Sequence, residues 1–348
     1  MHIRFELSVI PWRATVKQAL ERINSLKGIP LTLFVTDPDG ALCGTLTDGD
    51  IRRGLLTGAS LADEVTAVMH RNYRYLRHDG ETTLSFRQAR EAGIEVMPIL
   101  GPDRHILDIV DLRHTHALLP LDAVLMAGGR GERLRPLTET VPKPLLPVGG
   151  KPIIDHNVEA LQRCGISNIH VTVNYLHEQL ERHFAERRDP TPVRCTLEPA
   201  PLGTFGSIGL VEGLTHDNVL VMNSDLLTTI DFEKLYERHL ESGAALTMAV
   251  TTYTVSVPYA IVHTEGDRVE SFREKPTYNF FANAGIYIVR REMLATVTGR
   301  ERVDATDFID SLLARGLKVA YFPIDGTWID IGSPDDYAMA CSKMDMKH

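Results

Sequence analysis

The chain has 348 residues, of which 43% are hydrophobic and 24% charged, and its formal net charge is −9 at pH 7. This length predicts about two domains, and the composition is that of a soluble protein with packed cores. The acidic balance and the lack of a long basic run exclude the electrostatic footprint of a nucleic-acid-binding protein.

The absence of a recognisable targeting signal and the distribution of the cysteines predict a cytoplasmic location. The N-terminal segment lacks the apolar core of a signal peptide, and no stretch of about 18 apolar residues predicts a membrane span. The four cysteines, Cys43, Cys164, Cys195 and Cys341, are scattered and show no zinc-type spacing. We therefore expect a cytoplasmic protein with reduced thiols, no membrane partner and no nucleic-acid partner.

Residues 1–116 are predicted to form a first domain, because a helix–strand–turn–strand pattern occurs in them twice. The first copy has a helix with apolar Val16, Ala19, Leu20 and Ile23, a strand Leu31–Val35, a turn Asp37–Gly40 and a strand Gly44–Arg52. The second copy has a helix with apolar Leu84, Phe86 and Ala89, a strand Val96–Leu100 and a strand Ile106–Arg113.

This repeat resembles a tandem pair of CBS (cystathionine-β-synthase-type) modules, an α+β arrangement, over about residues 5–113. Many such pairs bind adenine nucleotides, so the resemblance implies an adenine-nucleotide effector with Asp50 or Asp111 at the ribose and Thr47 at a phosphate. Asp108 stands where the second copy would have a threonine, and its charge would repel a phosphate. The alternative is a structural or dimerising module without a ligand.

Residues 121–348 are predicted to form a second domain, with an α/β fold, a Rossmann-like first half and a mainly parallel mixed sheet. Buried parallel strands are expected at Ala123–Met126, Ile169–Val173 and Asn218–Met222. Helices are expected at Ile153–Cys164 and His177–Arg187. Ligands of such sheets bind beyond the carboxyl ends of the strands.

A glycine-rich loop, LMAGGRGERLRPL over residues 125–137, follows the first of these strands. Gly128, Gly129 and Gly131 let the backbone pass close to a ligand, and their amides suit anionic oxygens. Arg130 and Arg133 flank them with guanidinium groups that match phosphate geometry. The loop is neither a dinucleotide fingerprint nor a Walker loop.

Lys143 lies between two prolines in the segment PKPLLP that follows the loop. The prolines stiffen the backbone and fix the direction of the ammonium group, so we expect a phosphate contact. The loop followed by this segment resembles the sugar-1-phosphate nucleotidyltransferase family, over about residues 121–345.

The resemblance implies a set of site residues. Its nucleotide-binding residues are Leu125, Ala127, Gly128, Gly129, Gly131, Glu132, Glu198, Gly203 and Thr204. Its catalytic residues are Arg133, Lys143, Asp225 and Lys275, its Mg²⁺ ligands are Asp225 and Asp330, and its sugar-binding residues are Glu274, Asn283 and Gly285. Ser224 replaces the glycine that the family has before the metal-binding aspartate. Thr204 and Ser207 are also candidates for a helix N-cap.

The implied reaction is attack by the phosphate of a sugar 1-phosphate on the α-phosphorus of a nucleoside triphosphate, with release of pyrophosphate. A CBS pair ahead of this domain resembles the bacterial guanylyltransferases that make GDP-glucosamine for legionaminic acid biosynthesis. This favours GTP and glucosamine 1-phosphate, with mannose 1-phosphate as the alternative sugar. A sugar-nucleotide sensor without catalysis is the alternative from another class. We expect a homo-oligomer.

Overall fold

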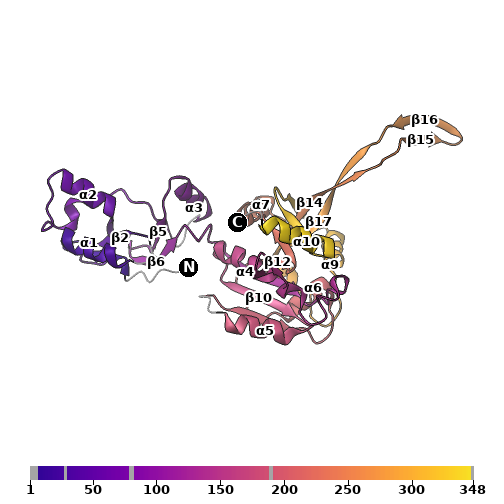
Figure 1. Cartoon of the computed structure of the whole chain (residues 1–348), viewed down its shortest axis with the longest axis horizontal. Coiled ribbons are helices and arrows are strands. Elements are labelled where there is room, and N and C mark those ends of the chain that lie inside the picture. Colours follow the sequence, from indigo (N-terminus) through magenta and orange to yellow (C-terminus); the bar gives the residue numbers. More distant parts are fainter. Residues whose placement is uncertain (1–6, 27–29, 78–81, 188–190, 346–348) are drawn as a thin grey trace. The chain divides into compact units, whose positions relative to one another are not determined.

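The structure is a computed structural model that describes residues 7–26, 30–77, 82–187 and 191–345. The chain divides into two compact units (Figure 1). Unit 1 comprises Met1–Leu119 with Arg163–Gly165, and unit 2 comprises Pro120–Gln162 with Ile166–His348. None of the helices in the described part of the chain combines the length and the apolar composition needed to cross a bilayer.

Unit 1 contains one topology twice, which confirms the predicted internal repeat. In each half a helix joins two parallel strands, and the second strand pairs antiparallel with a third. The first half has β1 Val9–Pro11, α1 Val16–Ser25, β2 Thr32–Thr36, β3 Leu42–Thr47 and α2 Asp48–Leu56. The second half has β4 Leu76–Arg77, α3 Thr82–Glu91, β5 Val96–Leu100 and β6 Ile106–Asp111. A short 3₁₀ helix, η2 (Val65–Ala67), lies between the halves in sequence.

The two halves of unit 1 share a hydrophobic core. Phe34 and Leu42 of the first half pack in one cluster with Val96, Leu100 and Ile109 of the second. Apolar residues from both sheets therefore leave water together, and this burial stabilises the pair as one unit.

The strand expected over Gly44–Arg52 is wrong in its second half, because the chain becomes helical at Asp48. Thr47 Oγ1 accepts a hydrogen bond from the Asp50 backbone N–H at 3.2 Å, and Asp50 Oδ2 accepts one from the Thr47 N–H at 2.8 Å. This capping box satisfies the first amides of α2 and ends the strand. The carboxylate of Asp50 also pairs with Arg53 at 2.5 Å.

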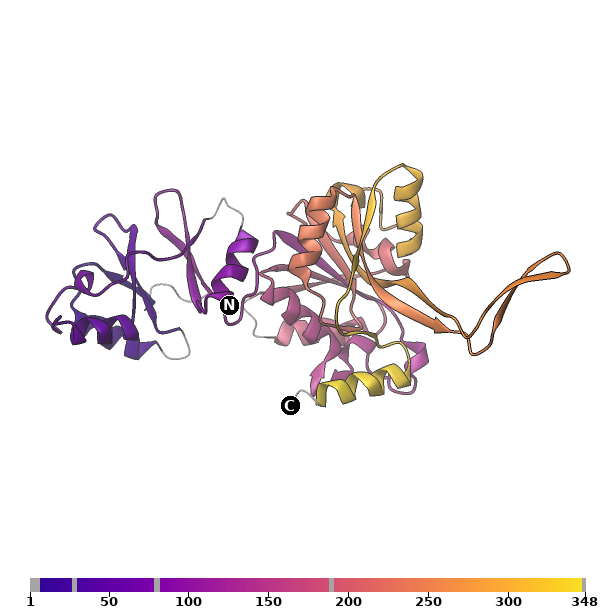
Figure 2. The same ribbon diagram turned by 90° about the horizontal axis from the view of Figure 1, so that it is seen from above.

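Unit 2 is built around a seven-stranded mixed sheet in the order β11-β10-β7-β12-β17-β14-β18 (Figure 2). Its strands are β7 Leu121–Ala127, β10 Asn168–Val173, β11 Val193–Leu197, β12 Asn218–Asn223, β14 Leu246–Ser256, β17 Thr277–Arg290 and β18 Val319–Pro323. All neighbours are parallel except the two pairs that involve β17. The predicted mainly parallel mixed sheet is thus confirmed.

The helices of unit 2 are α4 Ile153–Arg163, α5 His177–Glu186, α6 Gly203–Gly206, α7 Phe232–Ser242, α8 Arg291–Leu294, α9 Ala305–Ala314 and α10 Pro334–Asp345. Smaller elements are η3 Glu132–Leu134, η4 Lys143–Leu145, η5 Ser207–Leu210, β8 Pro147–Val148, β9 Lys151–Pro152, β13 Leu226–Thr228 and β19 Trp328–Asp330. Phe205 stacks on Phe308 with ring centroids 4.9 Å apart and meets Tyr287 edge-on at 5.3 Å. These rings join α6, α9 and β17 in one core.

A long arm projects from unit 2 (Figures 1 and 2). The outer parts of β14 and β17 form a two-stranded ribbon, Thr251–Ser256 with Thr277–Ala282. The hairpin of β15 (Ile261–Glu265) and β16 (Arg268–Arg273) continues it to the tip.

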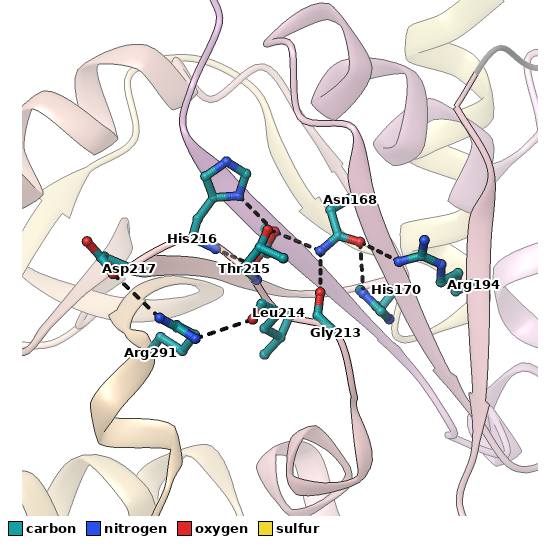
Figure 3. Close-up of polar contacts among 10 residues, drawn as sticks. Asn168, His170, Arg194, Gly213, Leu214, Thr215, His216, Asp217 and Arg291 are labelled. Carbon is teal, nitrogen blue, oxygen red and sulfur yellow. Dashed lines mark hydrogen bonds and ion pairs between the residues drawn. The ribbon is translucent and has the colours of Figure 1, made fainter. Parts of the chain in front are cut away.

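Asp122, near the start of β7, links the beginnings of three neighbouring strands. Figure 3 shows its partners Asn168, Thr215 and His216. The Asp122 side chain is fully buried and accepts hydrogen bonds from Asn168 Nδ2 at 2.8 Å, from the Thr215 backbone N–H at 2.5 Å and from His216 Nδ1 at 2.8 Å. Burial raises its pKa, but the hydrogen bonds from His216, Asn168 and the two backbone amides outweigh burial and set the pKa below its usual value.

We predict that Asp122→Ala lowers the unfolding free energy of unit 2 by about 3 kcal/mol, because it leaves several buried donors without an acceptor. The chain has two tryptophans, so Trp328 reports on unit 2 in a Trp12→Phe background. Urea titration followed by this fluorescence measures the change. The matched control is Asp217→Ala, whose side chain is 95% exposed; it should change the free energy by less than about 0.5 kcal/mol.

The same measurement has an expected pH dependence. A carboxylate with a lowered folded pKa stabilises the fold above its unfolded pKa of about 3.9, and this contribution is lost as pH falls through the folded pKa. The difference between the parent and Asp122→Ala should therefore narrow below about pH 4. If Asp122→Ala and Asp217→Ala lowered the unfolding free energy equally at neutral pH, the stabilising role of the Asp122 hydrogen bonds would be contradicted.

Candidate active site

Two adjoining cavities lie beyond the carboxyl ends of β7 and β12. The first has a volume of about 310 Å³, and its lining includes Ala127, Gly128, Gly129, Lys143, Glu198, Gly203, Thr204 and Asp225. The second, of about 320 Å³, is lined by residues that include Asn283, Gly285 and Asp330. Thr204, Asn223 and Asp304 line both cavities. The structure thus brings together most of the residues singled out in the sequence.

The glycine loop forms one wall of the first cavity. Gly131 has φ +60°, and a Cβ there would meet the Thr138 side chain at 3.0 Å and Lys143 Cβ at 3.1 Å. The Thr138 hydroxyl donates to the Gly131 carbonyl at 2.7 Å and holds this turn. A Cβ on Gly128 would lie 2.5 Å from Glu198 Oε1. The loop therefore needs glycine where it passes closest to its neighbours.

Glu198 is a buried carboxyl group in the wall of this cavity, with 6% of its surface exposed. Burial raises its pKa, and hydrogen bonds from the Leu202 N–H and from the hydroxyls of Ser207 and Thr172 offset this only in part. The group is therefore short of hydrogen-bond donors, and a ligand with donors would stabilise its charged form.

Lys143 carries the buried positive charge of the site. The 3₁₀ helix η4, which it begins, holds it in place, and only 9% of its surface is exposed. Its Nζ donates to Asp225 Oδ2 at 2.5 Å and lies 3.9 Å from Asp330 Oδ1. Burial, and next the charge of Asp225, raise the pKa of Asp330, against the lowering effect of Lys143 and Arg133. Two carboxylates thus share one ammonium group.

Asp225 has an oxygen that is free to bind a cation. Its Oδ1 is buried and has no hydrogen-bond partner. No group of three or more His, Cys, Asp or Glu residues suited to a metal occurs in the part of the chain that the structure describes. Mg²⁺ takes one or two carboxylates and completes its octahedron with water and phosphate. The pair Asp225 and Asp330 fits this ion, although no larger protein cage exists among these residues.

Ser224, which stands where a glycine was expected, joins the ends of the two central strands. It is buried, and its hydroxyl donates to the Met126 carbonyl at 2.7 Å. Asn157 Nδ2 donates to the Ser224 carbonyl at 3.1 Å. The serine therefore fixes the backbone that presents Asp225, and the substitution adds a bond where glycine would have none.

Asp304 was not predicted as a site residue, because its local pattern with Asp307 is that of a helix capping box at the start of α9 and not that of a ligand site. Its Oδ1 accepts a hydrogen bond from the Thr204 backbone N–H at 3.1 Å, and Thr204 Oγ1 accepts one from the Ala305 N–H at 2.8 Å. The expected N-cap role of Thr204 or Ser207 in its own segment is wrong, because α6 and η5 have no side-chain cap. Thr204 instead satisfies the first amide of α9.

Asn283 and Gly285 form a rigid corner in the second cavity. Asn283 donates to the Tyr287 hydroxyl at 2.7 Å and accepts from the Gly285 N–H at 3.0 Å. Gly285 has φ +69°, and a Cβ there would lie 2.6 Å from Asn223 Nδ2. Trp328 Nε1 donates to the neighbouring Ala284 carbonyl at 2.9 Å. The polar groups of this corner are thus held in fixed directions.

Three predicted site residues in β7 and the glycine loop do not line the cavities with their side chains. Leu125 is fully buried inside the sheet. Glu132 is exposed and lies 3.8 Å from Arg135. Arg133 is also exposed, and its guanidinium group lies 3.1 Å from the position that a Cβ on Gly332 would take. Its positive charge lowers the pKa of Asp330.

Glu274 and Lys275, predicted to bind the sugar and its phosphate, lie on the arm instead. Both are exposed, between β16 and β17, and Lys275 has φ +39°. β17 begins at Thr277, and a strand rises about 3.3 Å per residue, so this end of the strand lies about 20 Å from Asn283. The structure therefore does not bring these two residues together with the cavities.

The tentative adenine-nucleotide residues of unit 1 also have partners of their own. Thr47 and Asp50 hold each other in the capping box, and Asp111 is bound by Arg113 at 2.7 Å. Burial raises the pKa of Asp111, and the bonds from Arg113 outweigh it and lower the pKa. The Asp108 carboxylate accepts from the Ile109 N–H at 2.8 Å.

Comparison with known proteins links unit 2 to guanylyltransferases. The chain is 35% identical over 226 residues to the mannose-1-phosphate guanylyltransferase catalytic subunit beta of Danio rerio, covering 62% of each chain. It is 32% identical over 223 residues to the D-glycero-alpha-D-manno-heptose 1-phosphate guanylyltransferase of Aneurinibacillus thermoaerophilus, covering 63% of this chain and 96% of that protein. This chain thus spans about three-fifths of the length of the Danio protein.

A solved structure agrees with this similarity. The crystal structure of HddC from Yersinia pseudotuberculosis matches with a TM-score of 0.51 and 26% identity, over 64% of this chain and 99% of that one. Residues 122–346 also match the family model described as nucleotidyl transferase. By sequence and by fold, the chain belongs to the nucleotidyl transferase family.

Proposed function

We propose that this chain transfers a guanylyl group from GTP to a sugar 1-phosphate of manno configuration and releases pyrophosphate. The observation that carries the proposal is the pair of cavities beyond β7 and β12, where a glycine loop, a buried lysine and two carboxylates meet. This arrangement suits two anionic reactants, because the loop amides and Lys143 attract phosphate oxygens.

The chemistry needs no protein nucleophile. A phosphate oxygen of the sugar 1-phosphate forms a bond to the α-phosphorus, and the bond from that phosphorus to the pyrophosphate oxygen breaks. The protein positions the two anions and neutralises their charge with Lys143 and Arg133. A Mg²⁺ ion held by Asp225 and Asp330 would supply further charge neutralisation. The unpartnered Asp225 Oδ1 supports this assignment.

Glu198 supports guanine as the base. A carboxylate only accepts hydrogen bonds, and guanine presents a ring N–H and an amino group side by side as donors. Adenine presents no such adjacent pair, because its ring nitrogen N1 is an acceptor. The buried, under-satisfied Glu198 beside Gly128 is therefore suited to a guanine edge. The guanylyltransferase relatives point to the same nucleotide.

The relatives favour a sugar other than the one expected from the sequence. The two relatives are named for mannose 1-phosphate and for a manno-heptose 1-phosphate, which share the manno configuration. Neither glucosamine 1-phosphate nor legionaminic acid is named by either relative. We therefore place mannose-type sugars first, with the Asn283–Gly285 corner as the sugar subsite. Roles for Glu274 and Lys275 stay predictions and need the arm to bend toward the cavities.

We predict that, in the presence of Mg²⁺, the protein releases pyrophosphate fastest from GTP with mannose 1-phosphate or manno-heptose 1-phosphate. The panel combines GTP, ATP, UTP and CTP with these two sugars, glucose 1-phosphate and glucosamine 1-phosphate. The variant Asp225→Asn should lose at least about 100-fold in kcat, since it removes one of the two carboxylates that would hold Mg²⁺. Circular dichroism checks that this variant is folded. Fastest release from another base or from glucosamine 1-phosphate would overturn the substrate assignment.

A second prediction concerns the base alone. Glu198→Gln keeps the size of the side chain but places an amide donor against the donors of guanine. We expect kcat/KM for GTP to fall about 10- to 100-fold, and that for ATP to stay within about 3-fold. Steady-state kinetics with both nucleotides measures the two ratios. An equal loss for GTP and ATP would show that Glu198 does not contact the base.

We further propose that unit 1 is a CBS pair with one adenine-nucleotide site. The repeated topology and the shared core support this. We predict that AMP binds the full-length Asp225→Asn protein in calorimetry, and that either Asp50→Asn or Asp111→Asn weakens binding at least about 10-fold. Asp48→Asn, next to this site in α2 and paired with Arg52, should leave the Kd unchanged. If AMP gave no heat of binding, the alternative of a structural or dimerising module without a ligand would be favoured instead.

A further inference from the structure

The outer half of the ribbon has one polar face and one apolar face. In an antiparallel pair, directly opposed residues share a face and successive residues alternate. Tyr253 opposes Phe280, and Val255 opposes Tyr278. The alternate pairs are Thr254 with Asn279 and Ser256 with Thr277, and Thr254 Oγ1 bonds Asn279 Oδ1 at 2.8 Å. One face of this half thus carries aromatic and aliphatic groups, and the other carries hydroxyls and an amide.

Nearer the sheet the second face is not polar throughout. Phe281, which opposes Thr252 there, is 59% exposed, and its ring lies 5.3 Å from the ring of Tyr321 in β18.

The apolar face is uncovered in the described part of the chain. Tyr253 is 61% exposed and Phe280 56% exposed, while Tyr278 stacks beside Phe280 with ring centroids 6.4 Å apart. Farther out, Phe272 opposes Val262 in the hairpin and is 70% exposed. Exposed apolar side chains gathered in this way are typical of an interaction site.

The rest of unit 2 contacts this ribbon at its base, where the Phe281 ring lies 5.3 Å from the Tyr321 ring, but no further strand pairs with the ribbon in the described residues. The pairing of β18 with β14 reaches only as far as Val250, and the pairing of β12 with β17 begins only at Ile286. Beyond these points the two strands pair only with each other in the described residues. An isolated two-stranded ribbon is marginally stable in water. The arm therefore gains most from a partner that covers its apolar face.

The charges near the tip of the arm narrow the choice of partner. They are close to balanced: Glu265, Asp267, Glu270 and Glu274 against Arg268, Arg273 and Lys275. A nucleic acid or an anionic membrane would require a basic surface. An uncharged stripe beside mixed charges is instead compatible with a second copy of itself, because a two-fold axis brings the same patch together from both copies.

We propose that the apolar face of the arm, defined by Tyr253, Val255, Tyr278 and Phe280, is a dimerisation surface for a second copy of this chain. Two arms pack face to face around a two-fold axis, with Val262 and Phe272 extending the contact. Full burial of an aromatic side chain removes about 150–250 Å² from water. Because Tyr253, Phe280 and Phe272 are 61%, 56% and 70% exposed, the face removes on the order of 500 Å² per copy. This area is slightly below the roughly 600–1,000 Å² per partner of stable interfaces and corresponds to a weak dimer.

The test compares two matched double variants with the wild-type chain. Tyr253→Ser with Phe280→Ser removes the centre of the apolar face, and Thr254→Ser with Asn279→Ser changes the opposite face of the same two strands. Sedimentation equilibrium between about 1 and 50 μM should give a dimer of the 38.8-kDa chain for the wild type and the polar-face variant. The apolar-face variant should dissociate, with a Kd raised at least about 100-fold.

A second measurement uses the wild-type chain alone. Amide hydrogen exchange over 251–256 and 277–282 should slow as concentration rises through the dimerisation range, because dimerisation orders the ribbon. A wild-type chain that stays monomeric at about 50 μM, an apolar-face variant that still dimerises, or ribbon exchange independent of concentration would each overturn the proposal. Circular dichroism confirms that both variants are folded before these outcomes are interpreted.

Discussion

The hydrogen bonds that converge on Asp122 lie at one end of β7, and the glycine loop begins at the other end of this strand. They fix β7 against β10 and against the segment that enters β12. A slip of one residue would move a strand by about 3.3 Å and exchange its two faces. Lys143 and Asp225 could not then meet at 2.5 Å. The geometry of the site therefore depends on a buried carboxylate about 20 Å away, along the length of β7.

The contacts of Lys143 show how this fold stabilises a buried positive charge. An ammonium group loses hydration when it is buried, and it is stable there only with opposite charge close by. Asp225 and Asp330 supply that charge, and their mutual repulsion is relieved by the same lysine. Anionic phosphates attract the lysine, and a cation attracts the carboxylates. When phosphates and a cation bind, Lys143 can therefore pair with the phosphates, and Asp225 and Asp330 can pair with the cation.

Short motifs in the sequence predicted most of this site, because each one lies at the carboxyl end of a strand or in the loop that follows it. Gly128, Lys143 and Asp225 meet although Lys143 and Asp225 are 82 residues apart, and a parallel sheet brings such ends to one edge. Asp304 could not be found in this way. Its contact with Thr204 spans 100 residues and follows from the packing of α9, which leaves no local pattern.

The place of Glu274 and Lys275 on the arm could not be predicted from the order of the motifs. The segment with Glu274 and Lys275 follows the other motifs in the expected order, yet the position of a strand residue depends on how far its strand continues. β18 ends at Pro323, and the backbone hydrogen bond from the Ile324 N–H to the Val250 carbonyl of β14, at 2.9 Å, follows directly after it. The ribbon therefore leaves the sheet with only two strands and carries these residues away from the cavities. The alternation of apolar and polar residues in the sequence predicts an apolar face on the ribbon. It does not predict that this face lacks a third strand beside it, because that depends on where β18 ends, and β18 is distant in the sequence.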